Sequence, residues 1–270
     1  MMMKKHIYHI TVILFIASFI YGCSKDDLFD IVIGGQPAFV GNHQFAPGLN
    51  IFGVIRPDSL DAKSMNLIHV EKVIPAVSDT EDSTTVSDFK AVIYKTNNNV
   101  VIDSLCFTYT YPDTTFTHQP DDFIPMPGNR FKISCQSPGL PVLSAETIIP
   151  NQPVIVGDII NSSNNKAQFS ILSDTTAFLY DIYLLAGSNQ YYQRILRAKT
   201  GNTTVEIAAN LSVGSNAQLL IYAYDKNLSA YLTAPNLFVK PNTYRPPFST
   251  VQNGYGCFGS LNLLRKELQY

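Results

Sequence analysis

Short runs of apolar and alternating residues, each ended by Gly, Pro, Asn or Asp, occupy the chain from about residue 36 to residue 241. Helical periodicity is almost absent there, whereas alternation with a period of two is typical of strands. Only 15% of the residues are charged, and the chain contains 15 Tyr and 16 Phe. Such side chains suit pleated, half-buried surfaces. The sequence therefore predicts an all-β fold.

The predicted strands fall into two groups, separated at residues 149–153 by Ile-Pro-Asn-Gln-Pro. Two prolines remove two donors from any ladder, which favours a joint between domains. We expect an N-terminal β-sandwich over residues 36–150 and a fibronectin type III- or immunoglobulin-like sandwich over residues 151–241. The predicted strands are 50–56, 66–73, 89–94, 100–109, 130–135 and 142–148, then 154–160, 166–173, 178–186, 191–198, 203–208, 217–225 and 236–240.

The chain has no Trp, so smaller side chains must fill the second core. The candidates are Phe169, Ile171, Tyr180, Ile182 and Ile221. Two polar loops are expected at residues 79–87 and 112–122, and residues 229–233 are expected to lead into the last strand. Residues 242–270 predict a Gly-rich extended segment that packs back on the sandwiches, in which 261–270 is the one amphipathic helical candidate.

The N-terminus resembles a lipoprotein signal peptide. Lys4 and Lys5 precede an apolar stretch over residues 7–20, which is shorter than the roughly 20 residues that a membrane-spanning helix needs. This length is typical of a signal-peptide core. The stretch ends in Ile20-Tyr21-Gly22-Cys23, which resembles the lipobox cut by lipoprotein signal peptidase, although Ile20 and Tyr21 depart from its usual residues. We therefore expect removal of residues 1–22 and acylation of Cys23; the alternative is an ordinary secreted protein.

The residues after the cysteine suggest where the protein goes. Ser24-Lys25-Asp26-Asp27 resembles the export signal that takes Bacteroidota-type lipoproteins to the cell surface. The alternative is a solvated tether, which any lipoprotein needs between lipid and fold. We expect residues 23–35 to form the acylated cysteine and its tether, and the protein to be anchored in the outer membrane and displayed on the surface.

The charge of the chain argues against nucleic acid as a partner. Removal of Lys4 and Lys5 with the signal peptide leaves 17 of the 19 basic residues against 21 acidic ones, a net charge of −4. That sign gives no electrostatic attraction to nucleic acid or anionic lipid.

The sequence predicts no catalytic, cofactor or metal site, so we expect that the protein is not an enzyme. His43, His69 and His118 lack the spacing of metal ligands. A cation bound near His118 is one alternative, and a solvated loop is the other. The residues 254–259 match G-x-G-x-x-G, but only 11 residues follow, too few for a dinucleotide-binding unit. The glycines favour a tight turn or a close approach of strands instead.

Cysteines and tyrosines leave alternatives open. Cys106 and Cys135 could pair or stay as buried thiols, and Cys257 is expected to be a packed small side chain. The tyrosines at positions 191 and 192, and at 109 and 111, could stack on sugars or peptides. The alternative is the commoner role of tyrosines in strands, in which the ring is half-buried.

Three stretches together resemble one family. They are Pro47-Gly48-Leu49-Asn50-Ile51-Phe52-Gly53-Val54-Ile55-Arg56; Gly128-Asn129-Arg130-Phe131-Lys132-Ile133 with Leu143-Ser144-Ala145-Glu146-Thr147-Ile148-Ile149-Pro150; and Phe248-Ser249-Thr250-Val251-Gln252-Asn253-Gly254-Tyr255-Gly256-Cys257-Phe258-Gly259. The chain is similar to Bacteroidota surface lipoproteins catalogued as domain-of-unknown-function family 4249. The resemblance implies a partner of TonB-dependent, SusC-like outer-membrane receptors and supplies no catalytic residues.

These observations predict a surface lipoprotein that binds an unknown nutrient, glycan or peptide ligand, or docks on a TonB-dependent receptor. Two other classes stay open at this point. The chain could be an adhesive or structural surface module, or a glycan or peptide hydrolase whose paired acids the sequence cannot reveal.

Overall fold

The structure is a computed structural model of the chain. The chain divides into two units, Met1–Phe45 and Ala46–Tyr270, and the description below concerns the second. The described residues are 46–57, 67–73, 84–86, 88–108, 115–117, 125–162, 166–196, 201–209, 216–234 and 250–269.

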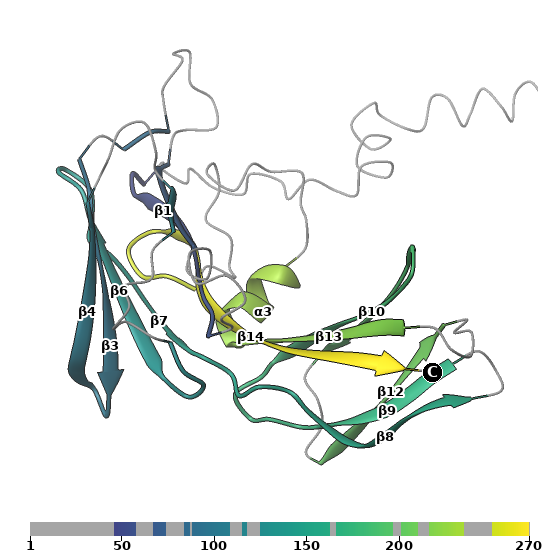
Figure 1. The fold of residues 1–270 in the computed structure, drawn as a ribbon. Helices are drawn as coiled ribbons and strands as arrows, with labels where there is room; N and C mark the ends of the chain where they lie inside the picture. Colours follow the sequence, from purple (N-terminus) through teal and green to yellow (C-terminus); the bar gives the residue numbers. More distant parts are fainter. Residues whose placement is uncertain are drawn as a thin grey trace, which may run out of the picture. The chain divides into compact units, whose positions relative to one another are not determined.

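The first half of this unit supplies one sandwich. Its strands are β1 (Leu49–Ile55), β2 (Leu67–Lys72), β3 (Lys90–Asn97), β4 (Val100–Thr108), β5 (Thr115–Thr117), β6 (Arg130–Gln136) and β7 (Leu143–Ile148). Four of them form a sheet in the order β4-β3-β6-β7 (Figure 1). One core is buried between this sheet and β1 and β2, and its largest fully buried members include Ile51, Ile68, Ile93, Phe131 and Ile133.

The second half supplies a second sandwich with a core of its own. Its strands are β8 (Val154–Ser162), β9 (Lys166–Leu172), β10 (Leu179–Ala186), β11 (Asn189–Leu196), β12 (Asn202–Ala208) and β13 (Asn216–Tyr224). The sheet β12-β9-β8 encloses the core with β10, β11 and β13. The five residues expected to fill this core, Phe169, Ile171, Tyr180, Ile182 and Ile221, are all buried. The all-β prediction is confirmed, and so is a fibronectin-like sandwich, although its sheet is completed by a strand from beyond residue 241. The expected strand 236–240 lies outside the described residues.

One long strand belongs to both sandwiches. The strand β14 (Tyr255–Gln269) pairs through its first six residues with β1 in parallel and through its last nine with β13 in antiparallel. The result is a seven-stranded sheet in the order β11-β10-β13-β14-β1-β2-β5. Figure 1 shows β14 in yellow. The expected extended C-terminal segment is therefore a central strand of the fold.

Three local predictions were wrong. Residues 261–270 were a helical candidate, yet residues 261–269 lie in β14; Leu261 and Leu263 are buried on one face while Leu264 packs into the second core on the other. A strand covered on both faces lacks alternation, so its apolar pattern does not distinguish it from a helix. Residues 229–233 form no lead into a strand, because helix α3 (Lys226–Leu232) occupies this stretch. The polar loop expected at 112–122 contains β5.

The glycine motif of residues 254–259 serves the close packing of β14. Gly256 has φ +96°, and a Cβ placed there would lie 2.0 Å from the carbonyl oxygen of Ile51. A Cβ on Gly259 would lie 2.7 Å from Cβ of Leu228 in α3. The prediction that these glycines permit a close approach of strands is therefore confirmed. Residues 254–259 do not form a dinucleotide-binding loop, since they lie at the start of a strand.

Candidate functional site

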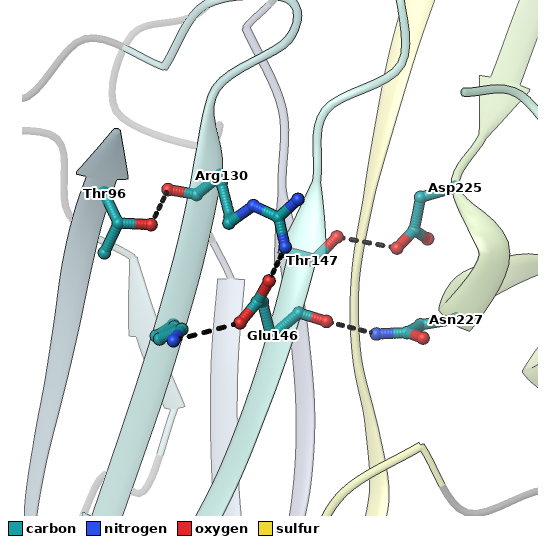
Figure 2. A network of polar contacts seen from close by, with 7 residues as sticks. Thr96, Arg130, Glu146, Thr147, Asp225 and Asn227 are labelled. Carbon is teal, nitrogen blue, oxygen red and sulfur yellow. Dashed lines mark hydrogen bonds and ion pairs between the residues drawn. The ribbon is translucent and has the colours of Figure 1, made fainter. Parts of the chain in front are cut away.

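A polar network fastens α3 to the first sandwich (Figure 2). Asp225, 4% exposed, caps the helix: its Oδ1 accepts from the backbone N–H of Leu228 at 2.8 Å, and its Oδ2 lies 2.6 Å from Oγ1 of Thr147 in β7. Asn227 Nδ2 donates to the carbonyl oxygens of Glu146 at 2.6 Å and Phe258 at 2.9 Å. The network therefore joins α3, β7 and β14.

Buried hydroxyl groups surround Asp225. Thr147 Oγ1 also lies 2.8 Å from Ser260 Oγ, and Ser260 Oγ donates to the carbonyl oxygen of Ile148 at 2.8 Å. Burial raises the pKa of Asp225 above its ordinary value, against the lowering effect of the hydrogen bonds that Thr147 and backbone N–H groups donate to it.

The rest of this network is charged and only partly buried. Glu146 forms ion pairs with Arg130 and with Lys132, the latter at 3.3 Å. Burial alone would raise the pKa of Glu146, but the hydrogen bonds and charges of Arg130 and Lys132 outweigh it, so this pKa lies below its ordinary value. Because every carboxylate here is engaged within the protein, we assign the network a structural role.

A different group of side chains forms the candidate binding surface. On the outer face of β10, β11 and β13, four tyrosines surround an ion pair, and we call this group the tyrosine face; it comprises Asp181, Tyr183, Tyr192, Arg194, Tyr222 and Tyr224. Strand register places them together, because Asp181 lies opposite Arg194 on one side and Tyr222 on the other, and Tyr183 lies opposite Tyr192.

The ion pair at its centre is almost fully dehydrated on the acidic side. Asp181, 3% exposed, accepts from Arg194 Nε at 2.7 Å and Nη2 at 2.8 Å, and from the Tyr192 hydroxyl at 2.7 Å. Burial alone would raise the pKa of Asp181, but hydrogen bonds from Arg194 and Tyr192 outweigh it and hold the pKa below its ordinary value. Asp181 is therefore an anion that orients its neighbours.

The rings around this anion are held in fixed positions. The Tyr183 ring centroid lies 5.0 Å from that of Tyr192 and 5.9 Å from that of Tyr222, the latter in an edge-to-face arrangement. Burial and the bond to Asp181 raise the pKa of Tyr192 to about 12, so its hydroxyl remains a donor. Tyr192 is nevertheless 49% exposed. The site thus offers solvent a rigid aromatic ring, with little entropy to lose on stacking.

Helix α3 borders the tyrosine face. Arg194 Nη1 donates to the carbonyl oxygen of Leu232 at the end of the helix, at 3.4 Å. Tyr231 of the helix packs against Phe52 of β1, with ring centroids 5.4 Å apart. The face is therefore positioned from both the sheet and the helix.

The structure separates the two neighbouring tyrosines that the sequence singled out. Tyr191 packs against the second core, whereas Tyr192 points outward into the tyrosine face. Tyr109 and Tyr111 lie outside the described residues. Sequence reasoning missed Asp181, Arg194 and their tyrosine partners; a two-residue turn at residues 187–188 was the signal, because it fixes which residues of the hairpin face one another.

The described cysteines are all free thiols. Cys106 is exposed, and Cys135 and Cys257 are buried. Cys135 belongs to the first core and Cys257 packs beneath α3, as a small apolar side chain would. Burial raises the pKa of both buried thiols to about 12, so neither is a reactive thiolate.

Other predicted residues lie mostly outside the described part of the chain. Cys23, the segment 24–27, His43 and His118 all lie outside the described residues. His69 Nε2 lies 3.0 Å from Glu71. Within the described ranges, no group of three His, Cys, Asp or Glu side chains could hold a metal ion. A helix with the length and apolarity needed to cross a bilayer is also absent from these ranges.

Comparison with known proteins finds likeness only among solved structures. No model of a protein family and no curated protein matches the chain. A two-domain fibronectin type III segment of chicken tenascin aligns with 84% of this chain and 100% of its own, at 10% identity and a TM-score of 0.28. The FN1–FN3 domains of chicken CNTN1 align with 84% of this chain and 68% of their own, at 13% identity and a TM-score of 0.29. The fold assignment accordingly rests on the strands and sheets themselves.

Proposed function

We propose that this chain is a lipoprotein of the outer membrane, displayed on the cell surface, which acts as a non-catalytic binding component of a TonB-dependent, SusC-like receptor. The lipobox-like sequence at Cys23 and the signal-like segment 24–27 support the location. The tyrosine face supports the binding role, because aromatic side chains beside an Arg are the residue types that dominate the energetics of binding surfaces.

The tyrosine face is the single observation that carries the binding role. Its acid, Asp181, accepts hydrogen bonds from Arg194 and from the Tyr192 hydroxyl. Such a group has no free nucleophile or base to offer, but it holds the Tyr192 ring still for a sugar ring or a peptide side chain. Ligand capture is thus the chemistry that this surface favours.

The location is tested on the mature N-terminus. Mass spectrometry of the protein from membranes is expected to find Cys23 as the first residue, carrying acyl chains. Protease treatment of intact cells is expected to digest the protein, and alanine substitutions of Asp26 and Asp27 are expected to protect it. An unmodified cysteine, or a leader still attached, would overturn the anchor; digestion unaffected by the alanines would overturn the export signal.

The binding role is tested by affinity isolation from detergent-solubilised outer membrane. A TonB-dependent barrel receptor is expected to co-purify with the wild type and to be depleted at least about tenfold by Tyr192→Ala, which corresponds to about 1.4 kcal/mol. Tyr192→Phe keeps the ring and is expected to retain more receptor than Tyr192→Ala. Tyr94→Ala, on the outer face of the other sheet, is the matched control. Isolation without any barrel receptor contradicts the receptor role and favours the adhesive alternative.

A further inference from the structure

The strand β11 ends the seven-stranded sheet with one edge open. It pairs with β10 on one side, and no backbone hydrogen bond from its other side is made within the described part of the chain. We propose that this edge pairs with β11 of a second copy of the chain, antiparallel and about a two-fold axis at Gln193. The inference involves Tyr192 of the tyrosine face, but its evidence does not depend on the receptor proposed above.

The hairpin geometry fixes which backbone groups face outward. Only residues 187–188 separate the strands, and Ala186 lies opposite Asn189. This closing pair of a two-residue hairpin is a hydrogen-bonded pair, and such pairs alternate along an antiparallel ladder. Residues 189, 191, 193 and 195 therefore bond to β10. The N–H and C=O groups of residues 190, 192, 194 and 196 point to the open edge.

Residues 190, 192, 194 and 196, whose backbone groups point to the open edge, also carry exposed side chains in β11. Tyr192 is 49% and Leu196 is 65% exposed on this strand, which contains no proline and no lysine. Its one charge, Arg194, is neutralised by Asp181. Edges of sheets are usually protected by charge, proline, bulges or shortness. Here β5 is three residues long and β8 has a register shift near Gly157, whereas β11 is eight residues long with an unbroken register.

A two-fold axis at Gln193 makes the strand complementary to itself. Tyr192 then lies opposite Arg194 of the second copy, where a guanidinium can stack on the ring, and Gln190 lies opposite Leu196. All four outward-facing residues are paired in this register. A shift of two residues loses pairs at the ends and sets Tyr192 against Tyr192 or Arg194 against Arg194.

An unsatisfied amide lies at the same point. Gln193 Oε1 is buried and has no hydrogen-bond partner within the described residues. On the two-fold axis Gln193 lies opposite Gln193 of the second copy, and a turn of each side chain from the core towards the open edge lets Nε2 of one copy donate to Oε1 of the other. Because an amide carries both a donor and an acceptor, the two side chains satisfy each other. The proposed pairing thus supplies a partner for a group that is otherwise costly to bury.

The pairing is weak in solution and favoured at a membrane. One strand pair buries less than the roughly 1,200 Å² of a standard stable interface, so we expect a dissociation constant on the order of 10–100 µM. Two copies anchored in one membrane have a raised effective concentration. The outer faces of the two sheets then continue into each other, and the two tyrosine faces form one surface.

Disulfide trapping in intact cells tests the register. Gln193→Cys is placed in the full chain with Cys106→Ser, which removes the exposed thiol. Facing Cβ atoms in such a pair lie about 4.5–5.5 Å apart, close enough for a disulfide after a small adjustment. Oxidation is expected to give a dimer at least about fivefold more efficiently than in Gln190→Cys, which lies off the axis. Equal trapping of both variants, or trapping of a different protein, overturns the proposal.

A second pair of variants tests the backbone bonds. Gln190→Pro with Leu196→Pro removes two outward N–H groups and leaves the ladder to β10 intact, so the fold is kept. Added to the Gln193→Cys chain, this pair is expected to abolish trapping, whereas Gln190→Ala with Leu196→Ala retains it. Equal trapping with proline and alanine overturns the proposal. Loss of trapping on Ile102→Lys, at the exposed apolar edge of β4, also overturns it.

Discussion

Substitution of Gly256 by alanine is expected to destabilise the protein strongly, because two independent costs meet at this residue. Its φ of +96° is unfavourable for any residue with a Cβ, at about 1–3 kcal/mol. The new Cβ would also lie 2.0 Å from the Ile51 carbonyl oxygen, where ordinary contact begins at 3.4 Å. The strands β1 and β14 would have to separate locally by 3.4 − 2.0 = 1.4 Å.

Such a separation breaks ladder hydrogen bonds on both sides of Gly256. Two lost bonds at about 1 kcal/mol each, added to the φ cost, give a total of about 3–5 kcal/mol. Gly201→Ala is the matched control: its φ is +101°, but nothing lies within 4 Å of the new Cβ. The control therefore carries the φ cost without the clash.

The measurement is urea unfolding followed by circular dichroism. With a slope of about 2 kcal/mol per molar, Gly256→Ala is expected to lower the midpoint by about 1.5–2.5 M. Gly201→Ala is expected to lower it by about 0.5–1.5 M, through the φ cost alone. Midpoints for the two variants within about 0.3 M of each other would refute the clash argument.

Three further predictions concern single side chains. Asp225 has a raised pKa in the folded state, so ionisation of this buried carboxyl destabilises the fold as the pH rises through that pKa. Asp225→Asn is therefore expected to be more stable than the wild type at pH 7 and to lose this advantage towards pH 4. Unfolding free energies measured at several pH values test this. Arg194→Met leaves buried Asp181 without its cation and is expected to cost about 2–3 kcal/mol of unfolding free energy, which Asp181→Asn in the same chain partly restores. Alkylation of the folded protein is expected to modify Cys106 and spare Cys135, as read by peptide mass spectrometry, and equal modification would contradict the burial of Cys135.

Most strands could be predicted from the sequence because each has one buried face and a clear breaker at its end. The run Lys-Ala-Gln-Phe-Ser-Ile-Leu of β9 alternates between buried and exposed residues along its length. The expected range 166–173 accordingly agrees with the strand to within one residue. Alternation fails where both faces are covered, which is why the second half of β14 resembled a helix.

The candidate site could be predicted only in part. The sequence indicates Tyr192 as an aromatic residue in a strand, but its fixed position depends on Asp181, eleven residues away, which accepts a hydrogen bond from its hydroxyl. The sequence also contains a signal for α3, since Asp225 is a favourable helix cap. Asp225 follows a strongly alternating run, however, so the sequence alone predicts it as the end of that strand. Contacts between facing strands depend on register, which periodicity alone does not supply.

The shared strand has a consequence for how the chain is made and exported. Residues 255–269 follow every other described strand, yet they contribute Phe258 to one core and Leu268 to the other. Neither sandwich can close before these residues emerge, so both apolar interiors stay exposed on a growing chain. Nascent chains arrested before Tyr255 are expected to be cut by protease throughout, and both halves to become resistant together once residue 269 is free. Late completion of both sandwiches would suit the export proposed above, because a chain that crosses a membrane unfolded must not fold too early.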